Sequence, residues 1–565
     1  MSHISSAKAN ATYHSNTIQN ELIFISGDLI KDRVIKQIKD AKCWTILADD
    51  TMDRQKREQC AICIRYLSQD EENNFVIKED PILILDIIAE IKKMKEDNVD
   101  EEDSNGVDPE VRLSGEAIGQ VLLKKMEQLG LDLNCCIAQG YDGASTMSSE
   151  RVGVSAVFRN EAPSAHYFHC VMHCLNLTAS KAIKVPGIRH AEDIVEEVSR
   201  FFRSSAKRTD LLKSLIEQGK GEVKLKKHLT TLSKTRFVER HTAVVTMREL
   251  LPYVIEALET MKNWASIDAR RSAQSLLNSI LQSDFIVGLI VLEKLAGLLL
   301  PLTRALQTVG MDLVDAFSLI NDTKSLLNSV RSDEKFAAMF KEAEKLADSL
   351  DVVLKQPRIA RKSVHRGIAV STSCAADCTS AVEIYYRVNF FYPAIDAIVQ
   401  DMNLRFGNHQ ETTVVFCRVI PALISSNVDE NWVRIMKAID CYQPFFLDSR
   451  ETIESEYQLW CKKWESVEFE KRPKSAIEAL QHCGVFFPNM AILLEILACL
   501  PVSTAQPERV FSKLERTLTA IRSTMTEDRL EALLLLQIHR EYTPGTDEII
   551  DRFAHTSARK LNFLL

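Results

Sequence analysis

Hydrophobic and polar positions along the first third of the chain follow two different periods. Short apolar runs with the length of buried strands occupy residues 44–48, 59–67, 81–89, 133–138 and 166–170. Apolar residues spaced three and four apart predict helices over residues 27–41, 114–129 and 152–160. Three strands that can form a meander, followed by alternating helices and strands, predict a mixed sheet covered by helices.

This order of elements is that of a ribonuclease-H-like domain, an α/β fold in which acids on the first and fourth strands converge on one metal site. Two apolar runs end in such acids. The first leads into Asp49, and the fourth leads into Asp142, which lies between Gly140 and Gly143. Glycines relieve steric limits where a strand turns, so Asp142 is placed to face a ligand. A turn or a helix cap is the alternative role for Asp142.

From residue 178 to about residue 474 the pattern becomes almost entirely helical, which predicts a large helical block that buries its apolar stripes internally. Its most apolar run, residues 285–302, is interrupted by Glu293 and Lys294 and predicts a buried helix rather than a membrane span. A loop over residues 355–380 starts basic, which is typical of a solvated linker and also suits nuclear import or phosphate contact.

The C-terminal part predicts a helix over residues 489–500 and then a helix pair over 503–519 and 527–541. The last helix is apolar over more than one face. It is therefore either deeply buried in the chain's own core or turned towards a partner. On the second interpretation its dimerisation residues are Leu530, Leu533, Leu534 and Ile538.

Composition sets the class of protein. The chain has 565 residues, of which 46% are hydrophobic and 26% charged, as in soluble globular proteins of two or three domains. Its net charge of −8 means that a nucleic-acid partner would need a local basic patch. Fourteen cysteines without regular spacing suit a reducing compartment, and the first residues form no apolar signal region. We therefore expect a nuclear location, with the cytoplasm as the alternative.

Several longer motifs resemble one family. They are Ala48-Asp-Asp-Thr-Met-Asp53, Gly140-Tyr-Asp-Gly-Ala-Ser-Thr-Met147, His169-Cys-Val-Met-His-Cys-Leu-Asn-Leu177, Lys234-Thr-Arg-Phe-Val-Glu-Arg-His241 and Pro501-Val-Ser-Thr-Ala-Gln-Pro-Glu-Arg-Val-Phe-Ser512. Together they look like a hAT-type transposase-derived protein, similar in style to the zinc-finger MYM-type proteins. The resemblance extends from about residue 10 to about residue 540.

The resemblance implies a ribonuclease-H-like core that is split by a large helical insertion and closed by C-terminal helices. Its domains would be a flexible N-terminus (1–20), the first part of the core (21–177), the insertion (178–474), the core helices with the hAT dimerisation region (475–541) and a tail (542–565). It further implies a homodimer or higher oligomer with DNA as a candidate partner, and no membrane association.

Family members cut and join DNA with an Asp-Asp-Glu triad, which by resemblance falls on Asp49, Asp142 and Glu508. These carboxylates would hold Mg²⁺ or Mn²⁺, because such ions prefer oxygen ligands, and two ions about 3.5–4 Å apart can hold the attacking and leaving oxygens. Of the three acids, Glu508 comes from the resemblance only.

Other motif residues are candidates for nucleic-acid contact. Cys170 and His173 match a Cys-x-x-His signature; zinc needs four ligands, so nucleic-acid contact or core packing is favoured over a zinc site. Arg236 and Phe237 stand in a motif where the family has Thr-Arg-Trp, and Phe237 can stack on a displaced base.

Three departures from the family pattern keep two functions open. Residues before position 40 show no Cys/His spacing of a DNA-recognition finger, Phe237 replaces a tryptophan, and Gln506-Pro507 precedes Glu508 where Ser-Ser is usual. Because proline is tolerated only in the first turn of a helix, we expect the catalytic helix to begin close to Pro507 or to bend there. The two functions are a metal-dependent DNA transposase core and a domesticated, non-catalytic, dimerising regulator of transcription that acts through protein partners.

Overall fold

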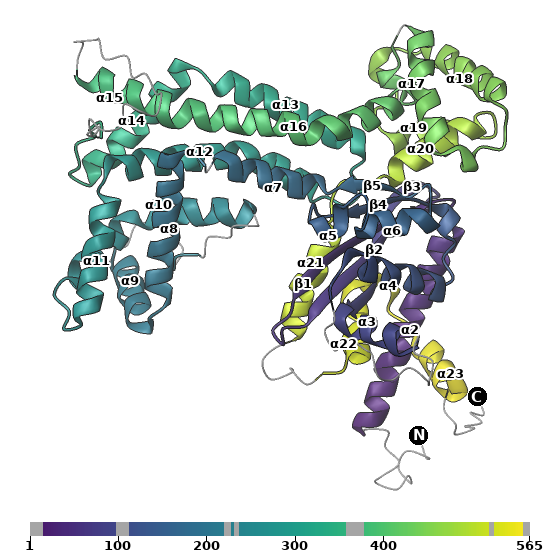
Figure 1. Ribbon diagram of the computed structural model, residues 1–565, viewed down its shortest axis with the longest axis horizontal. Coiled ribbons are helices and arrows are strands. Elements are labelled where there is room, and N and C mark those ends of the chain that lie inside the picture. Colours follow the sequence, from purple (N-terminus) through teal and green to yellow (C-terminus); the bar gives the residue numbers. More distant parts are fainter. Residues whose placement is uncertain are drawn as a thin grey trace. The chain divides into compact units, whose positions relative to one another are not determined.

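The computed structural model describes residues 15–97, 112–182, 184–219, 228–230, 237–357, 378–425, 427–518 and 525–556. The chain forms two compact units (Figure 1). Unit 1 consists of residues 1–173, 307–316 and 409–565, and unit 2 of residues 174–306 and 317–408.

Unit 1 is built around one five-stranded sheet. Its strands are β1 (Trp44–Met52), β2 (Glu58–Gln69), β3 (Phe75–Asp86), β4 (Cys136–Tyr141) and β5 (His166–His169). Its helices that precede unit 2 in the chain are α2 (Asn16–Asp40), α3 (Ile87–Asp97), α4 (Gly115–Gln128), α5 (Ser145–Ser148) and α6 (Val154–Glu161). Those after it are α17 (Val428–Cys441), α18 (Arg450–Glu465), α19 (Ala476–Leu480), α20 (Pro488–Cys499), α21 (Ala505–Thr517), α22 (Glu527–Ile538) and α23 (Thr546–Thr556).

The strand order is β3-β2-β1-β4-β5. Strands β1, β2 and β3 pair antiparallel, whereas β4 pairs parallel with both β1 and β5. The predicted mixed sheet, with a meander followed by strands that need helical crossovers, is therefore confirmed.

Strand β3 begins at Phe75, six residues before the predicted run at 81–89, and residues 87–97 form helix α3. The first half of β3 escaped prediction because it carries Glu79, a buried acid. Glu79 is buried because Arg65 of β2 donates to its carboxylate at 2.6 Å. A buried ion pair interrupts the apolar pattern without interrupting the strand.

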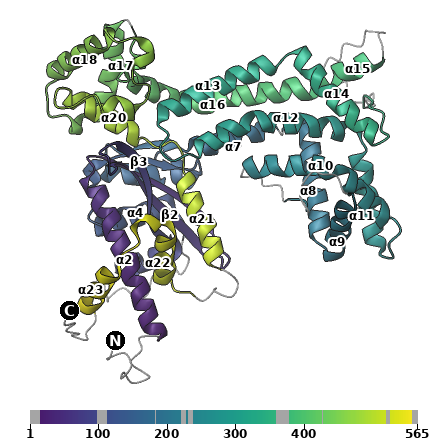
Figure 2. The ribbon, with the colours of Figure 1, turned by 180° about the vertical axis from the view of Figure 1, so that it is seen from behind.

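Each face of the sheet has its own core. One cluster joins alternate residues of β1 and β2, such as Ile46 and Ile62, to side chains of α2, α4 and α6. The other joins Leu47 and Ala61, on the opposite face, to side chains of α21 and α22. Figure 2 shows α21, α22 and α2 from the side opposite to Figure 1. Because strand side chains alternate, the face of β1 that carries Leu47 also carries Asp49.

The described residues nearest the two ends of the chain are helical, where the sequence predicted a flexible N-terminus and a tail. Helix α2 begins at Asn16, within the predicted flexible N-terminus, because Ser15 Oγ accepts a hydrogen bond from the Ile18 N–H at 3.4 Å and caps it. Helix α23 lies within the predicted tail, where Arg552 pairs with Asp32 of α2 at 3.2 Å. The predicted segments 1–20 and 542–565 are thus helical in part.

Helices α17–α20 cluster with unit 1, so unit 2 ends at residue 408, whereas the sequence predicted a helical insertion that reaches residue 474. Two buried contacts explain this. Glu456 of α18 accepts from the Met490 N–H of α20 at 2.9 Å, and Arg65 of β2 donates through Nη2 to the Ala498 carbonyl at 2.9 Å. Helix α20 therefore ties α18 to the sheet.

The regular secondary structure in the described residues of unit 2 is helical. It takes up most of α7 (Val171–Ala182) and then α8 (Pro186–Arg203), α9 (Ala206–Gln218), α10 (Phe237–Met261), α11 (Ile267–Ile280), α12 (Ser283–Leu306), α13 (Leu313–Val330), α14 (Asp333–Ser349), α15 (Cys378–Tyr386) and α16 (Tyr392–Cys417). The boundaries of the two units fall inside α7, α13 and α16.

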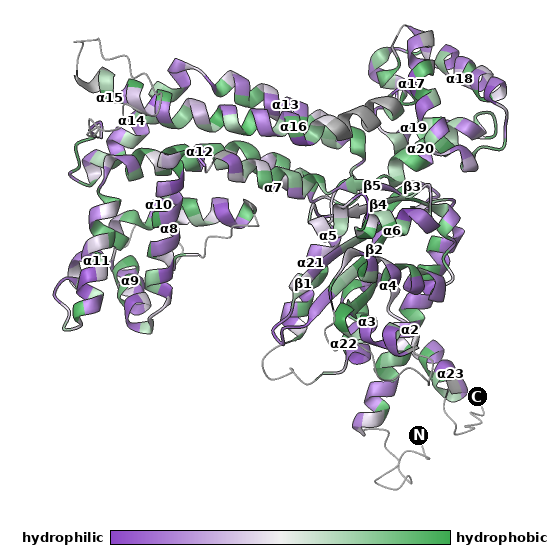
Figure 3. Cartoon of the chain, viewed as in Figure 1, coloured by the Kyte–Doolittle hydropathy of each residue, from purple (hydrophilic) through white to green (hydrophobic). Residues whose placement is uncertain are grey.

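Helix α12 is long and apolar enough to cross a membrane by length and composition, and two thirds of its most apolar window (67%) is buried inside the chain. Figure 3 colours most of α12 as hydrophobic. Its contact with α8 is close: a Cβ added at Gly288 would lie only 2.9 Å from the Ala191 Cβ. This burial fits the buried core helix that the sequence predicted.

Candidate functional site

The register of the sheet brings Asp49 and Asp142 to the same edge. Strands β1 and β4 are parallel neighbours, and their last paired residues are Leu47 and Gly140. Asp49 and Asp142 each follow two residues later, on the same faces as Leu47 and Gly140. The two acids that the apolar runs singled out therefore leave adjacent strands side by side.

The glycines around Asp142 provide space rather than an unusual backbone. A Cβ at Gly140 would lie 2.7 Å from Leu47 Cδ2 and 3.0 Å from Pro501 Cβ. A Cβ at Gly143 would lie 2.4 Å from His169 Cε1, and neither glycine has φ in the left-handed region. The predicted relief of steric limits therefore consists of space: without a Cβ, the two glycines admit a leucine, a proline and an imidazole ring against the strand end.

Asp142 also has the local role that was left open. Its Oδ1 accepts from the Ala144 N–H at 3.1 Å, and its carbonyl accepts from the Tyr167 hydroxyl at 2.9 Å. The side chain thus shapes the turn after β4, while helix α5 begins without a side-chain cap. One carboxylate oxygen is used in the turn, and the residue remains half-buried.

Helix α21 carries Glu508 in its first turn. The helix begins at Ala505, which places Pro507 where the missing N–H has no intrahelical partner to lose. The expectation that the helix starts close to Pro507 is confirmed. Phe511 and Leu514 of α21 pack in the same cluster as Leu47, so α21 covers the sheet face to which Asp49 belongs. A carboxylate in a first turn is also favoured by the helix dipole.

The electrostatics of Asp49 bring the three predicted acids together. Burial raises the pKa of Asp49 well above its usual range, and the negative charges of Glu508, Asp50 and Asp142 raise it further. The pKa of Asp50 is raised by burial and then by Asp142 and Glu58. The acids from β1, the β4 end and α21 therefore share one electrostatic environment.

Their donor atoms suit Mg²⁺ or Mn²⁺, because hard cations prefer carboxylate oxygens. A divalent cation would also relieve the repulsion that raises the pKa of Asp49. Among the residues that the structure describes, however, no group of three or more His, Cys, Asp or Glu side chains is placed so that it could hold a metal ion. The negative charges of Asp142 and Glu508 thus act on Asp49, but the three side chains are not arranged as a set of metal ligands. Their role in metal binding stays a prediction.

Cys170 fastens the segment that precedes α21. Its N–H donates to the Tyr141 carbonyl at 2.9 Å, and its Sγ accepts from the Thr504 N–H and from Thr504 Oγ1, both at 3.2 Å. The Val171 N–H donates to the Val502 carbonyl at 3.0 Å. These contacts tie the end of β4 and the start of α7 to the start of the helix that carries Glu508.

The thiol is 3% exposed, and burial raises the pKa of Cys170 to about 11. Core packing, one of the two roles predicted for this signature, is what its surroundings favour. His173 is half-buried, with its ring centroid 5.4 Å from that of His169. Arg236 lies outside the described residues, and Phe237 begins α10 with its side chain outside them. Nucleic-acid contact by these residues stays a prediction.

The predicted dimerisation residues are only partly available to a partner. Leu530 and Leu534 are 1% and 0% exposed, in the cluster formed with Leu47 and α21. Their assignment to dimerisation is corrected: they close the core of unit 1. Ile538 packs partly against the same cluster, and Leu533 is half-buried. The helix is apolar on several faces because α2 packs on it as well, with Gly27 against Ala532.

Two family models match parts of the chain. The model of the hAT family C-terminal dimerisation region matches residues 456–538, which include α20, α21 with Glu508, and α22. A second model, described as "ZMYM1/FAM200, RNase-like domain", matches residues 2–83, which include Asp49. The predicted resemblance to hAT transposase-derived proteins is confirmed by these matches.

Two curated proteins match almost the whole chain. The chain is 25% identical over 567 residues to the 52 kDa repressor of the inhibitor of the protein kinase of Homo sapiens, covering 96% of this chain and 68% of that protein. It is 24% identical over 568 residues to the Mus musculus protein of the same name, with the same coverage. The chain is thus similar to these repressors in both units.

Proposed function

We propose that unit 1 carries a divalent-cation-dependent site for phosphoryl transfer on DNA, formed by Asp49, Asp142 and Glu508. The observation that carries the proposal is geometric: β1 and β4 are parallel neighbours that lead into Asp49 and Asp142, and α21, which carries Glu508, packs on the sheet face to which Asp49 belongs. The raised pKa of Asp49 agrees with this arrangement. Acids that are far apart in sequence and repel one another within a fold gain stability from a shared cation.

The arrangement supports a ribonuclease-H-like core interrupted by unit 2. The strand order β3-β2-β1-β4-β5 and the return of the chain at residue 409 to supply α21 and α22 are what such a core requires. On this proposal β1 and β4 contribute the two aspartates, and the C-terminal helix α21 contributes the glutamate.

The chemistry is an in-line displacement at a DNA phosphodiester. A bond forms between phosphorus and the oxygen of water or of a DNA 3′-hydroxyl, the bond to the leaving oxygen breaks, and one proton passes from the attacking to the leaving oxygen. A bound Mg²⁺ or Mn²⁺ supplies charge stabilisation for the attacking and leaving oxygens. The carboxylates orient those groups, and the packing of α21 on β1 fixes Glu508 relative to Asp49.

The test uses the full chain with labelled nicked and hairpin DNA in Mg²⁺ or Mn²⁺. Cleavage is expected for the wild type and for Glu71→Gln, a matched change of an exposed acid in the β2–β3 turn. It is expected to be lost in Asp142→Asn. Absence of cleavage in the wild type, or cleavage that Asp142→Asn leaves unchanged, would refute the proposal.

A second readout does not depend on activity. Mg²⁺ that binds the folded state alone raises the free energy of unfolding by about 2.7 kcal/mol at one hundred times its dissociation constant. We expect this gain for the wild type and Glu71→Gln, and a reduced gain for Asp142→Asn. A protein that binds Mg²⁺ in this way but does not cleave DNA retains the site without the reaction.

The second candidate function is that of a domesticated, non-catalytic regulator of transcription that dimerises and acts through protein partners in the nucleus. It is favoured by the match to the dimerisation region and by similarity to proteins named as a repressor. On this proposal, Mg²⁺ leaves the stability of unit 1 unchanged, while a fluorescently tagged full chain accumulates in the nucleus and represses a reporter gene to which it is tethered. Repression that Asp142→Asn preserves would separate it from the first proposal.

A further inference from the structure

The ammonium group of Lys463, near the end of α18, is surrounded by aromatic rings. Its Nζ lies over the rings of Trp460, Trp464 and Phe487, at 5.3, 5.2 and 5.1 Å from their centres. The Trp460 ring is inclined by 75° to the Trp464 ring and by 69° to the Phe487 ring. Such a set of ring faces attracts a cation through the negative charge of the π-systems. We call Trp460, Trp464 and Phe487 the aromatic cage.

Two walls of the aromatic cage are fixed in the core of unit 1. Trp460 is fully buried, and its Nε1 donates to the Val419 carbonyl at 2.9 Å. Trp464 is buried as well, and Phe487 is half-buried directly before α20. Because these rings are already ordered, a cation that enters the aromatic cage loses little binding energy to the ordering of side chains.

Lys463 has few polar partners for a lysine in such a place. Its Nζ donates to the His482 carbonyl at 2.8 Å. Lys462, by contrast, forms an ion pair with Glu465 at 2.7 Å. An ammonium group has three N–H donors, so two donors of Lys463 find no protein acceptor among the residues that the structure describes, although three aromatic rings lie close by.

The distances inside the aromatic cage suit methyl groups. A C–N bond is about 1.5 Å long, so a methyl carbon on Nζ that points at a ring would lie about 3.6–3.8 Å from its centre. Carbon atoms in contact are about 3.5–4.0 Å apart. Two methyl groups would therefore fill the space between nitrogen and rings, and the one remaining N–H would still donate to the His482 carbonyl.

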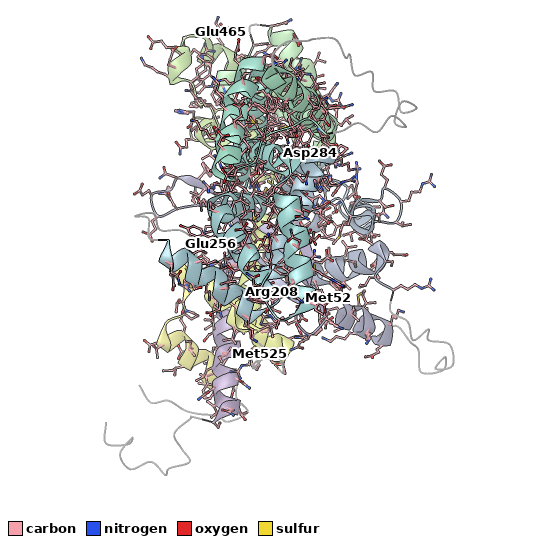
Figure 4. The ribbon with its side chains drawn as sticks, turned by 90° about the vertical axis from the view of Figure 1, so that its left-hand side faces the viewer. Met52, Arg208, Glu256, Asp284, Glu465 and Met525 are labelled. Atoms are coloured by element: carbon pink, nitrogen blue, oxygen red, sulfur yellow. The ribbon has the colours of Figure 1, made fainter. Side chains whose placement is uncertain are left out.

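We propose that Lys463 is a site of lysine dimethylation and that the aromatic cage holds the dimethylated ammonium group. Lys463 is half-buried and lies in the last turn of α18, which ends at Glu465. Figure 4 labels Glu465 at the top of the view. Rotation about the single bonds of a lysine side chain at the surface is fast, so the ammonium group can leave the aromatic cage to be modified and then return.

The modification is a methyl transfer that a separate methyltransferase carries out twice with a sulfonium methyl donor. The unprotonated Lys463 nitrogen attacks the methyl carbon. A carbon–nitrogen bond forms, and the carbon–sulfur bond breaks with its electron pair going to sulfur. The donor leaves as a thioether, and one proton for each methyl group passes from the nitrogen to solvent. The product keeps its positive charge and so its attraction to the rings. A third methyl group would remove the N–H that donates to His482.

The first measurement asks whether the modification occurs. The full chain is expressed in cultured mammalian cells and digested, and the peptides that contain Lys463 are analysed by tandem mass spectrometry. We expect dimethyl-lysine at position 463 and unmodified lysine at position 462, which is exposed and paired with Glu465. Peptides in which Lys463 is always unmodified, or in which Lys462 is methylated to the same extent, would overturn the proposal.

The second measurement asks whether the aromatic cage holds the product. Dimethyl-lysine is introduced into the full chain at position 463 by expansion of the genetic code, and unfolding in urea is followed. The equilibrium constant for unfolding should be about fivefold lower than in the unmodified chain, because the methyl groups contact fixed rings. Trimethyl-lysine should give a smaller gain, since its nitrogen has no N–H for the His482 carbonyl. Dimethyl-lysine at the exposed position 462 is the matched control and should change nothing.

A variant of the third wall isolates the role of the rings. Phe487→Leu removes one aromatic face from a half-buried position, and each modified chain is compared with the unmodified chain of the same background. Dimethylation of Lys463 should then lose most of its effect. No gain on dimethylation in the wild-type background, or a gain that Phe487→Leu leaves intact, would refute the role of the aromatic cage. None of these measurements needs DNA or a divalent cation, so their outcome is independent of the proposed acidic site.

Discussion

Substituting Gly140 with alanine would test how tightly the two halves of the candidate site are packed together. The new Cβ would lie 2.7 Å from Leu47 Cδ2 and 3.0 Å from Pro501 Cβ. Carbon atoms in contact are about 3.5–4.0 Å apart, so the leucine methyl must move by roughly 0.8 Å in a site where Leu47 is 0% exposed. The proline ring can yield little.

Overpacking of this kind costs about 1–3 kcal/mol. Restricting the unfolded chain at a glycine returns about 0.4–1 kcal/mol. We therefore expect Gly140→Ala to lower the free energy of unfolding of unit 1 by about 1–2 kcal/mol. Gly545→Ala is the matched control, because its Cβ would meet only Glu548 Oε2, at 3.9 Å, and its φ is unrestrictive. It should be neutral or slightly stabilising.

The assay is urea unfolding followed by tryptophan fluorescence, in which the midpoint should fall at constant slope. The source of the cost can be isolated with Leu47→Ala, which removes the clashing methyl. In that background Gly140→Ala should cost less than in the wild type, a coupling that a double-mutant cycle measures. Costs that simply add would refute the view that Gly140 is required by the Leu47 contact.

The remaining predictions concern buried charges and thiols. Because the pKa of Asp49 is raised in the folded state, its ionisation opposes folding at any pH above the ordinary value of about 4. Asp49→Asn should therefore stabilise unit 1 near pH 7, and this gain should vanish as the pH falls below about 4. A gain that does not depend on pH in urea titrations would contradict this prediction. Glu79→Gln should destabilise unit 1 by about 3–5 kcal/mol, because it leaves the buried charge of Arg65, which is 1% exposed, without its ion pair. A loss below about 1 kcal/mol, measured by chemical unfolding, would show that the reasoning is wrong. In native protein at pH 8, Cys441 should react with a maleimide well before Cys170, because Cys441 is exposed, whereas Cys170 is buried and has a pKa raised to about 11. The measurement is mass spectrometry of the labelled peptides, and labelling of Cys170 as fast as Cys441 would contradict its burial.

Each of the two aspartates could be located as a strand-terminal acid from local sequence. An apolar run that ends in an acid predicts a carboxylate at a strand end, and the meander followed by a helix predicts which strands become neighbours. The structure places β1 and β4 side by side and parallel, with Leu47 opposite Gly140. Finding each acid used only a short stretch of residues, whereas their convergence was predicted from the order of elements over residues 44–170.

Glu508 could not be found in that way. It is an acid in the first turn of a helix, as are Asp268 and Glu451, which have no part in the site. What distinguishes it is that Phe511 and Leu514 pack on Leu47 across more than four hundred positions. Long-range packing leaves no local signal, so only the family resemblance pointed to this residue.

The dimerisation residues show the limit of hydrophobic periodicity. The apolar pattern in α22 correctly predicts that several of its faces are covered, but it does not predict which elements cover them. The structure covers Leu530 and Leu534 with the sheet and α21, and sets Gly27 of α2 against Ala532. Conversely, Val485 and Phe486 lie in a short turn with no period at all, and their exposure becomes visible only once the neighbouring side chains are in place.

The Cys-x-x-His signature shows the same limit within the candidate site. Its residue types favour nucleic-acid contact or core packing over zinc, which needs four ligands, and they do not distinguish the first two. What decides is that the Cys170 sulfur accepts hydrogen bonds from the Thr504 N–H and hydroxyl at 3.2 Å and from the His173 N–H at 3.4 Å. Thr504 is the residue just before α21, and Glu508 is one turn further on. The signature therefore bears on the candidate site through position: Cys170, in a short motif after β5, holds the residue that precedes the helix carrying Glu508.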